Sequence, residues 1–289
     1  MEDRSHFFFN LCICLSFAIL TALTAREFGE VIITTVLRDT PIEVTIIVLL
    51  VLTALSTRRN IVKFSYIHLF YLPFLLGPAL GIILTSLQNA DVLNLEPVIG
   101  NHHTNIMGGL LDIAALFQSS FIITLIIPFM MKPEKAMKAS IWAMIIAGML
   151  YLLIVISTIA TFGPQETIRL IWPTLENART ASIPGGFLER LDVIFLIVWL
   201  ISVFTTMFTT YYLTCYTTQE LFHFKDHGLF STFLLPFVFV FAICPHDIFQ
   251  FFQIAQWTGR IGFFLTLCYP ILLWVIAVIR KKRERTCEE

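Results

Sequence analysis

The sequence predicts an all-α protein, a polytopic bundle of transmembrane helices. Hydrophobic residues make up 57% of the 289 residues and charged residues only 13%, about half the charged share of a typical soluble domain. The mean hydropathy of +0.82 indicates a protein that lies in a lipid bilayer. The apolar runs are continuous and rich in Leu, Ile and Phe, so they favour spanning helices over the alternating strands of a barrel.

Eight apolar runs define the predicted elements, since a helix needs about 20 residues to cross the hydrocarbon core. In chain order they lie near residues 7–35, 41–56, 64–88, 104–131, 139–162, 187–219, 229–244 and 259–280. The first lacks a basic leader and a small-residue cleavage site, so we interpret it as a retained span rather than a signal peptide. In the third, Gly77 and Gly81 have the spacing of close helix packing. We expect residues 1–289 to form a single integral membrane domain.

The basic residues predict how these spans are oriented. If both termini lie inside, 13 of the 19 Lys and Arg residues fall on the cytoplasmic side, where an excess of positive charge is expected. We therefore predict an N-in, C-in topology. The net charge of −1 gives no indication of a nucleic-acid partner, and we interpret the basic tail at 280–283 as an anchor against anionic headgroups.

Three of the spans carry charged residues where lipid would otherwise lie. An ionised group at mid-bilayer costs about 2.5–3.5 kcal/mol on insertion scales, so such groups tend to be paired, hydrated or functional. The predicted topology puts them in the outer half of the membrane, where we expect them to ring an outward vestibule and to shape access or gating. The candidates for this role are Arg26, Glu27, Glu30, Asp112, Glu189 and Asp192.

Small and polar residues follow one face of the first, fourth and sixth spans. In the fourth, Gly108, Asp112, Ala115 and Ser119 recur at steps of three and four, the spacing of one helix face. We expect the three faces to meet around a shared cavity, with a neutral, hydroxyl-lined pocket below the vestibule that suits a small zwitterion. The candidate ligand-binding residues are Thr24, Gln118, Ser119, Ser120, Ser202, Thr205 and Thr206.

Less specific interpretations of the same residues stay open. Arg26 can pair with Glu30 one turn along the helix, which would make the charged groups topology anchors rather than parts of a ligand site. The longer outer segments 89–103 and 163–186 can form lids over an outer entrance, or their Pro and Gly residues can simply reverse the chain.

Enzymatic or metal chemistry has little support in the sequence. His223 and His227 have the i, i+4 spacing of a zinc pair, but no third ligand is evident. Phosphate-binding loops, nucleophile elbows and metalloprotease motifs do not occur in the sequence. We predict a protein that is not an enzyme and that uses no metal and no cofactor.

Four short motifs are spread along the chain. They are Ala25-Arg26-Glu27-Phe28-Gly29-Glu30, Thr40-Pro41, Trp172-Pro173, and Phe187-Leu188-Glu189-Arg190-Leu191-Asp192 with Trp199 seven residues further on. In this combination the chain resembles the endospore germination protein family, the permease-like B subunits of nutrient germinant receptors. The resemblance covers essentially the whole chain.

This resemblance implies a member of the amino acid-polyamine-organocation superfamily, with two inverted five-helix repeats and a site at broken helices near the midplane. It implies a receptor subunit in the spore's inner membrane that binds a small germinant, such as an amino acid, sugar or nucleoside, and signals germination. The implied partners are an A-type subunit and a C-type lipoprotein subunit. The first, fourth and sixth spans would correspond to the family's third, sixth and eighth helices.

The resemblance also includes a departure, because the family has ten spans and this chain is expected to begin at the third. We therefore expect an N-terminal truncation of about two spans, which leaves a partial inverted-repeat fold. Two alternative functions follow. One is a proton-coupled amino-acid transporter of the same superfamily, and the other is a truncated structural subunit that assembles without binding ligand.

Overall fold

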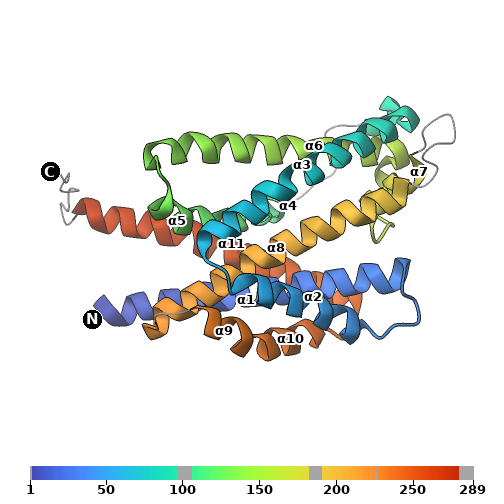
Figure 1. Cartoon of the computed structure of the whole chain (residues 1–289). Helices are drawn as coiled ribbons and strands as arrows, with labels where there is room; N and C mark the ends of the chain where they lie inside the picture. Colours follow the sequence, from blue (N-terminus) through green and yellow to red (C-terminus); the bar gives the residue numbers. More distant parts are fainter. Residues whose placement is uncertain (1, 97–105, 182–190, 225–226, 280–289) are drawn as a thin grey trace.

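The computed structural model describes residues 2–96, 106–181, 191–224 and 227–279 (Figure 1). Every regular element within these residues is a helix, so the all-α prediction is confirmed. In this described part of the chain, four helices are long and apolar enough to cross a membrane, and a bent pair makes up to five. The four lie over Asn10–Thr35, Ile61–Asn89, Pro133–Thr167 and Leu191–Phe222.

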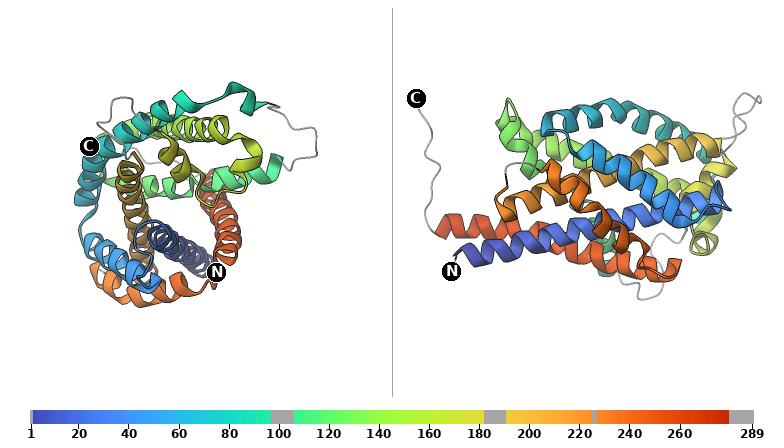
Figure 2. Two further views of the ribbon diagram at one scale, coloured as in Figure 1. Left: turned by 90° about the vertical axis from the view of Figure 1, so that its right-hand side faces the viewer. Right: turned by 60° about the horizontal axis from the view of Figure 1, so that its bottom comes forward.

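Helix α1 (Glu2–Thr35) forms the centre of the molecule. It packs against α2 (Ile42–Thr57), α8 (Leu191–Phe222), α10 (Leu235–Ile243) and α11 (Ile248–Ile279), which surround it in the end-on view of Figure 2. Its most apolar window is 61% buried, against 33% or less for the other three candidate spans. The start of α1 and the end of α11 lie at the same end of the bundle (Figure 1).

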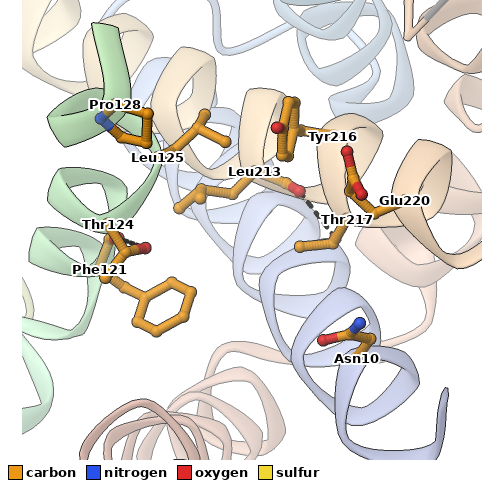
Figure 3. A pocket seen from close by; sticks show the side chains of 9 residues that line it. All are labelled: Asn10, Phe121, Thr124, Leu125, Pro128, Leu213, Tyr216, Thr217 and Glu220. Carbon is orange, nitrogen blue, oxygen red and sulfur yellow. Dashed lines mark hydrogen bonds between the residues drawn. The ribbon is translucent and has the colours of Figure 1, made fainter. Parts of the chain in front are cut away.

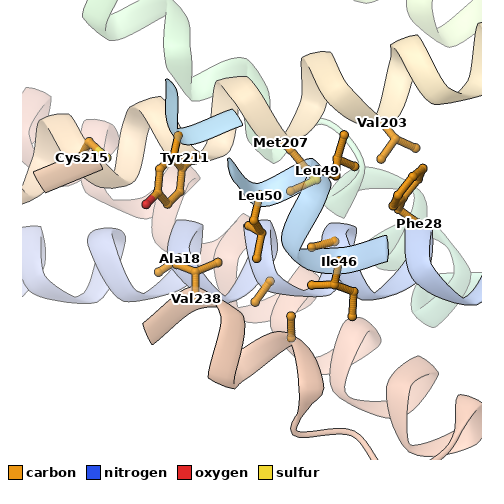
Figure 4. Packing of buried hydrophobic residues seen from close by; sticks show 14 residues of the cluster. Ala18, Phe28, Ile46, Leu49, Leu50, Val203, Met207, Tyr211, Cys215 and Val238 are labelled. Atoms are coloured by element: carbon orange, nitrogen blue, oxygen red, sulfur yellow. The ribbon is translucent and has the colours of Figure 1, made fainter. Parts of the chain in front are cut away.

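Small side chains let the neighbouring helices approach α1 closely. Ala18, Ala22 and Ala25 follow one face of α1 and are buried against α2, α8 and α10, as Figure 4 shows for this cluster. At Gly29 a Cβ atom would lie only 2.7 Å from Ile42 Cγ1, so glycine is needed where α1 and α2 meet. This packing fixes the interior face of α1.

Two of the eight predicted spans are shorter than a full crossing. Helix α2 has 16 residues, which is about 24 Å of helix against a hydrocarbon core of about 30 Å. The 229–244 span is divided into α9 (Gly228–Phe233) and α10, with Pro236 in the first turn of α10. The last predicted span, 259–280, falls within α11 as far as Ile279. By length and composition, the described residues contain four to five candidate spans rather than eight, and α11 is not among them.

The predicted 104–131 span is broken rather than continuous. Helix α4 (Ile106–Ala115) ends in a turn and is followed by η3 (Gln118–Phe121), α5 (Ile122–Ile126) and η4 (Ile127–Phe129). The two halves are bent by 45°. The amides of Leu116 and Phe117 donate to carbonyls three residues back instead of four, so the chain tightens into 3₁₀ geometry before the polar Gln118-Ser119-Ser120 segment.

Pro164 interrupts α6 (Ala136–Thr167) near its C-terminal end; this helix follows η5 (Pro133–Lys135). Gly163 has φ +74°, and Pro164 has no N–H to donate to the Ala160 carbonyl one turn back. The Asp91 amide and Asn94 Nδ2 donate to that carbonyl instead, each at 2.9 Å.

The described parts of the two long segments 89–103 and 163–186 are held against the bundle. The first contains η1 (Leu87–Asn89) and η2 (Val92–Leu95), and the second contains α7 (Pro173–Thr180), which packs on α3 (Ile61–Ser86), α6 and α8. Asn89 Nδ2 joins the two segments by donating to the Thr180 carbonyl at 2.8 Å. Residues 97–103 and 182–186 lie outside the described part, so a lid role stays a prediction.

Candidate functional site

The charged residues of α1 pair within the helix. Arg26 Nη2 and Nε lie 2.8 and 2.9 Å from Glu30 Oε1, and the two side chains are 8% and 12% exposed. The local-pair interpretation of these two residues is therefore confirmed. Glu27 is half-buried on the same helix, and its vestibule role stays a prediction.

Asp112 has partners that the sequence analysis did not identify. Its Oδ1 accepts from Arg260 Nε at 2.6 Å, and its Oδ2 accepts from Arg260 Nη2 at 3.0 Å and from Gln256 Nε2 at 2.9 Å. A bidentate guanidinium–carboxylate pair therefore joins α4 to α11. A signal was available, because opposite charges lie within two predicted spans, Asp112 in 104–131 and Arg260 in 259–280.

Below this pair, α4 and α11 stay in close contact. A Cβ atom at Gly259 would lie 3.1 Å from Ala115 Cβ, and one at Gly262 would collide with Gln118 Oε1. Asp112, Ala115 and Gln118 thus face α11 at steps of three. We call this contact the α4–α11 seam, defined by these three residues together with Gln256, Gly259, Arg260 and Gly262.

Gln118 occupies the break between the two halves of the broken span. Its side chain is 5% exposed, and its Oε1 is buried without a hydrogen-bond partner among the described residues. A Cβ atom at Gly262 would also lie 2.8 Å from Ser16 Oγ, so Gln118 lies between α11 and α1. The regular helix ends at Ala115. Gln118 therefore continues the face of Asp112 and Ala115, whereas Ser119, which helical spacing predicted, does not.

The other predicted ligand-binding residues are spread over several environments. Thr24 and Thr205 are buried and donate to the carbonyls of Leu20 and Ser202, each at 2.9 Å. Half-buried or exposed side chains belong to Ser119, Ser120, Ser202 and Thr206. A role in ligand binding stays a prediction for each of them.

The remaining vestibule candidates are at the start of α8. Asp192 is half-buried there, and Glu189 lies outside the described residues.

Helix α8 presents hydroxyl groups to two different neighbours. Thr210 Oγ1 accepts from Thr21 Oγ1 of α1 at 2.8 Å, whereas Thr209 Oγ1 lies 3.0 Å from Nε2 of His68 on α3. Thr209 therefore turns toward α3, and Thr210 contacts α1. His68 is a further intramembrane polar group that the sequence analysis missed, although a histidine within a predicted span is a signal.

A cavity of about 240 Å³ lies away from these residues (Figure 3). It opens between the first part of α1, the segment after the break, and the last part of α8. Its lining residues are Asn10, Phe121, Thr124, Leu125, Pro128, Leu213, Tyr216, Thr217 and Glu220. None of the predicted ligand-binding residues is among them.

One histidine of the pair considered as a metal site, His227, contacts the backbone of another helix end. His227 Nε2 lies 3.1 Å from the Arg59 carbonyl oxygen. Within the described residues no three His, Cys, Asp or Glu side chains gather as they would around a metal ion.

Long apolar helices around a broken span, with a buried ion pair on α1, define an integral membrane protein. Residues 6–251 match the family model described as "Spore germination protein". The chain therefore belongs to the spore germination protein family, and the resemblance noted in its sequence is confirmed.

Individual relatives agree with this assignment. Spore germination protein B2 of Bacillus subtilis (strain 168) is 24% identical over 279 residues, which cover 96% of this chain and 75% of that protein. Spore germination protein YndE of the same strain is 26% identical over 270 residues, 93% of this chain and 74% of YndE. Spore germination protein KB is 26% identical over 284 residues, with shares of 95% and 75%. No solved structure matches the chain.

Proposed function

We propose that this protein is the permease-like B subunit of a nutrient germinant receptor, which binds a small germinant at the broken span and signals germination. It acts by binding and conformational change rather than by enzymatic chemistry. The observation that carries the proposal is the buried Oε1 of Gln118 at the break, which has no hydrogen-bond partner among the described residues, in a chain of the spore germination protein family.

A buried polar atom without a partner costs about 1–3 kcal/mol, and native proteins keep such atoms mainly where something else supplies the partner. A broken membrane helix is tolerated where its backbone lines a protein interior or a cavity. Small germinants carry N–H or O–H donors that would satisfy Gln118. The hydroxyls of Thr24, Ser119 and Thr206 remain the predicted neighbours of that ligand.

The family also suggests the setting in which this site works. We place the chain in the inner membrane of the spore, with both termini inside and with α2, the 228–243 segment and α11 completing eight crossings. The fold would be part of an inverted-repeat permease. An A-type subunit and a C-type lipoprotein would assemble with it. Germinant binding would then favour one arrangement of the broken span over another and pass the change to these partners.

Gene deletion and complementation test the proposal. Spores without the gene should germinate slowly with one nutrient or nutrient mixture, and the wild-type gene should restore the response. Gln118→Leu should raise the half-maximal nutrient concentration at least tenfold at equal protein abundance. Gln253→Leu, an exposed glutamine of α11, serves as the control and should respond as wild type.

A normal response of the deletion strain to every nutrient tested would contradict the proposal. Accumulation of an amino acid in proteoliposomes, driven by a pH gradient, would favour the transporter alternative over the receptor function.

A further inference from the structure

The cavity of about 240 Å³ in Figure 3 lies apart from Gln118 and has no part in the proposed function. With both termini inside, as predicted, the start of α1 and the end of α8 put it on the cytoplasmic side. We call it the inner cavity. Its volume is below the roughly 300–1,000 Å³ of drug-sized sites, and it equals about eight molecules of liquid water at about 30 Å³ each. It therefore fits a small ligand.

The inner cavity has an apolar floor and a polar mouth. Leu213 and Leu125 form the floor and are only 1% and 8% exposed. Leu213 belongs to a core cluster that α8 shares with α1, so this floor is firmly packed. Thr124 and Glu220 lie at the mouth and are exposed. This gradient orients a ligand with its hydrocarbon part inward and its polar group at the mouth.

The threonine hydroxyls of the inner cavity offer acceptors rather than donors. Thr217 Oγ1 donates to the Leu213 carbonyl at 2.7 Å, and Thr124 Oγ1 donates to the Phe121 carbonyl at 2.7 Å (Figure 3). Each hydroxyl has a single proton, so toward a ligand both oxygens can only accept. The Thr124 carbonyl is a further acceptor, because Pro128, one turn along, has no N–H to donate to it.

Glu220 gives the inner cavity a negative charge that no lining residue balances. Of the nine lining residues none is Lys, Arg or His, and Glu220 forms no ion pair within the described part of the chain. Tyr216 lies one turn before Glu220 on α8, where its ring can contact a cation held by the carboxylate. One carboxylate and several acceptors without a cationic side chain favour a positively charged donor.

We propose that the inner cavity binds a small organic monocation with N–H donors, an alkylammonium or an alkylguanidinium. Its charged group lies beside Glu220, and its hydrocarbon chain lies against Leu125 and Leu213. This ligand is distinct from the germinant, so the inference goes beyond the proposed function and does not depend on it. The ligand contacts α1, the inner half of the broken span and α8 together, and it therefore stabilises their arrangement.

Other classes of ligand suit these groups less well. A carboxylate or a zwitterion would bring a second negative charge close to Glu220, with no cationic lining residue to balance it. Calcium and magnesium need about six or more oxygen ligands, and within the described residues no three His, Cys, Asp or Glu side chains gather. A neutral alcohol would leave Glu220 without a counter-charge.

Calorimetry with the full chain in phosphatidylcholine nanodiscs tests the inference, after subtraction of the signal from empty nanodiscs. The probes share one hydrocarbon chain and are n-pentylammonium, n-pentylguanidinium, 1-pentanol and L-norleucine, which is n-pentylammonium with an added carboxylate. We expect each monocation to bind with one molecule per chain. The alcohol lacks the charge and norleucine adds a repelled one, so both should bind at least fivefold more weakly.

Three variants locate the binding. Glu220→Gln should weaken n-pentylammonium binding at least fivefold without changing the affinity for 1-pentanol. Thr124→Trp fills the cavity from its mouth and should weaken binding of both monocations at least tenfold. Both positions are exposed, so the melting temperature of the ligand-free chain should not change. Glu166→Gln is the control, because Glu166 is an exposed glutamate that pairs with Arg169 at 3.3 Å, and it should leave the Kd unchanged.

Several results would overturn the inference. They are no measurable binding of either monocation to the wild-type chain, equal binding of n-pentylammonium and 1-pentanol, and wild-type affinity in a folded Glu220→Gln or Thr124→Trp variant. The two variants act independently, so either one decides the test if the other does not fold. The proposed function would stand in each case, because it concerns the germinant at Gln118.

Discussion

At the residue scale, two ion pairs of the bundle have different surroundings. Arg26 and Glu30 pair within one turn of α1 and are almost enclosed, whereas Asp112 and Arg260 pair between two helices and are partly open. Movement of one helix against another cannot separate the first pair, but it can separate the second. The first pair therefore stabilises the central helix, and the second depends on the packing of α4 on α11.

The buried pair leads to a prediction on stability. Glu30→Ala should lower the free energy of unfolding by about 3–5 kcal/mol, because it leaves the Arg26 charge without a counter-charge inside the bundle. Replacing both residues, Arg26→Met with Glu30→Leu, removes both charges together and should be close to neutral. Unfolding in mixed detergent micelles, titrated with SDS, measures both. A double variant as unstable as the single one would contradict this account.

The sequence predicted some of these residue contacts and missed others for identifiable reasons. Arg26 and Glu30 are four residues apart, so their pairing was among the alternatives considered. Asp112 and Arg260 are separated by 148 residues, and only the packing of α4 on α11 brings them together. The side chain of Gln118 was a candidate, but its unpartnered oxygen became visible only once the break placed it between α1 and α11.

At the element scale, backbone interruptions shape the molecule more than helix length does. Pro164 leaves the Ala160 carbonyl available, and Asp91 and Asn94 use it to hold η2 against α6. The break before Gln118 similarly redirects the fourth span. Long apolar helices were predictable from hydropathy. Their interruptions were not, because a 3₁₀ turn or a shortened helix depends on tertiary hydrogen bonds and packing that composition does not encode.

The kink in α6 gives a prediction with an internal control. Gly163 has φ +74°, where an L-residue with a side chain is strained by roughly 1–2 kcal/mol. Gly163→Ala should therefore lower stability by about that amount. Gly148→Ala lies in the same helix with nothing within 4 Å of the added Cβ, and it should be neutral or stabilise by up to about 1 kcal/mol. Equal melting temperatures for the two variants would show that the kink does not require glycine at Gly163.

At the scale of the whole molecule, α1 is the helix around which α2, α8, α10 and α11 pack. Its contacts with α2, α8, α10 and α11 include hydrogen bonds between hydroxyls, such as Thr21 with Thr210 at 2.8 Å. Such bonds between membrane helices contribute roughly 0.6–2 kcal/mol each. The sequence predicted that the first and sixth spans meet, and α1 and α8 do pack together. On α8 the hydroxyl that contacts α1 belongs to Thr210 and not to Thr209.

The predicted topology can be checked with reporter fusions. A reporter that is active only outside the cytoplasmic membrane should be inactive when fused after Arg59 and active when fused after Arg169. The physical basis is the excess of Lys and Arg on the predicted inner side. A reporter active only inside, fused at the same two positions, is the control and should give the opposite pattern. Activity of the first reporter after Arg59 would contradict the N-in, C-in arrangement.

The central claim is that a germinant binds at the broken span, and a structure solved with bound nutrient tests it most directly. The protein would be prepared in nanodiscs with a saturating concentration of the nutrient to which the spores respond. We expect ligand density beside Gln118, between Ser16 of α1 and Gly262 of α11. Density instead in the cavity between Asn10 and Glu220, with none beside Gln118, would contradict the account.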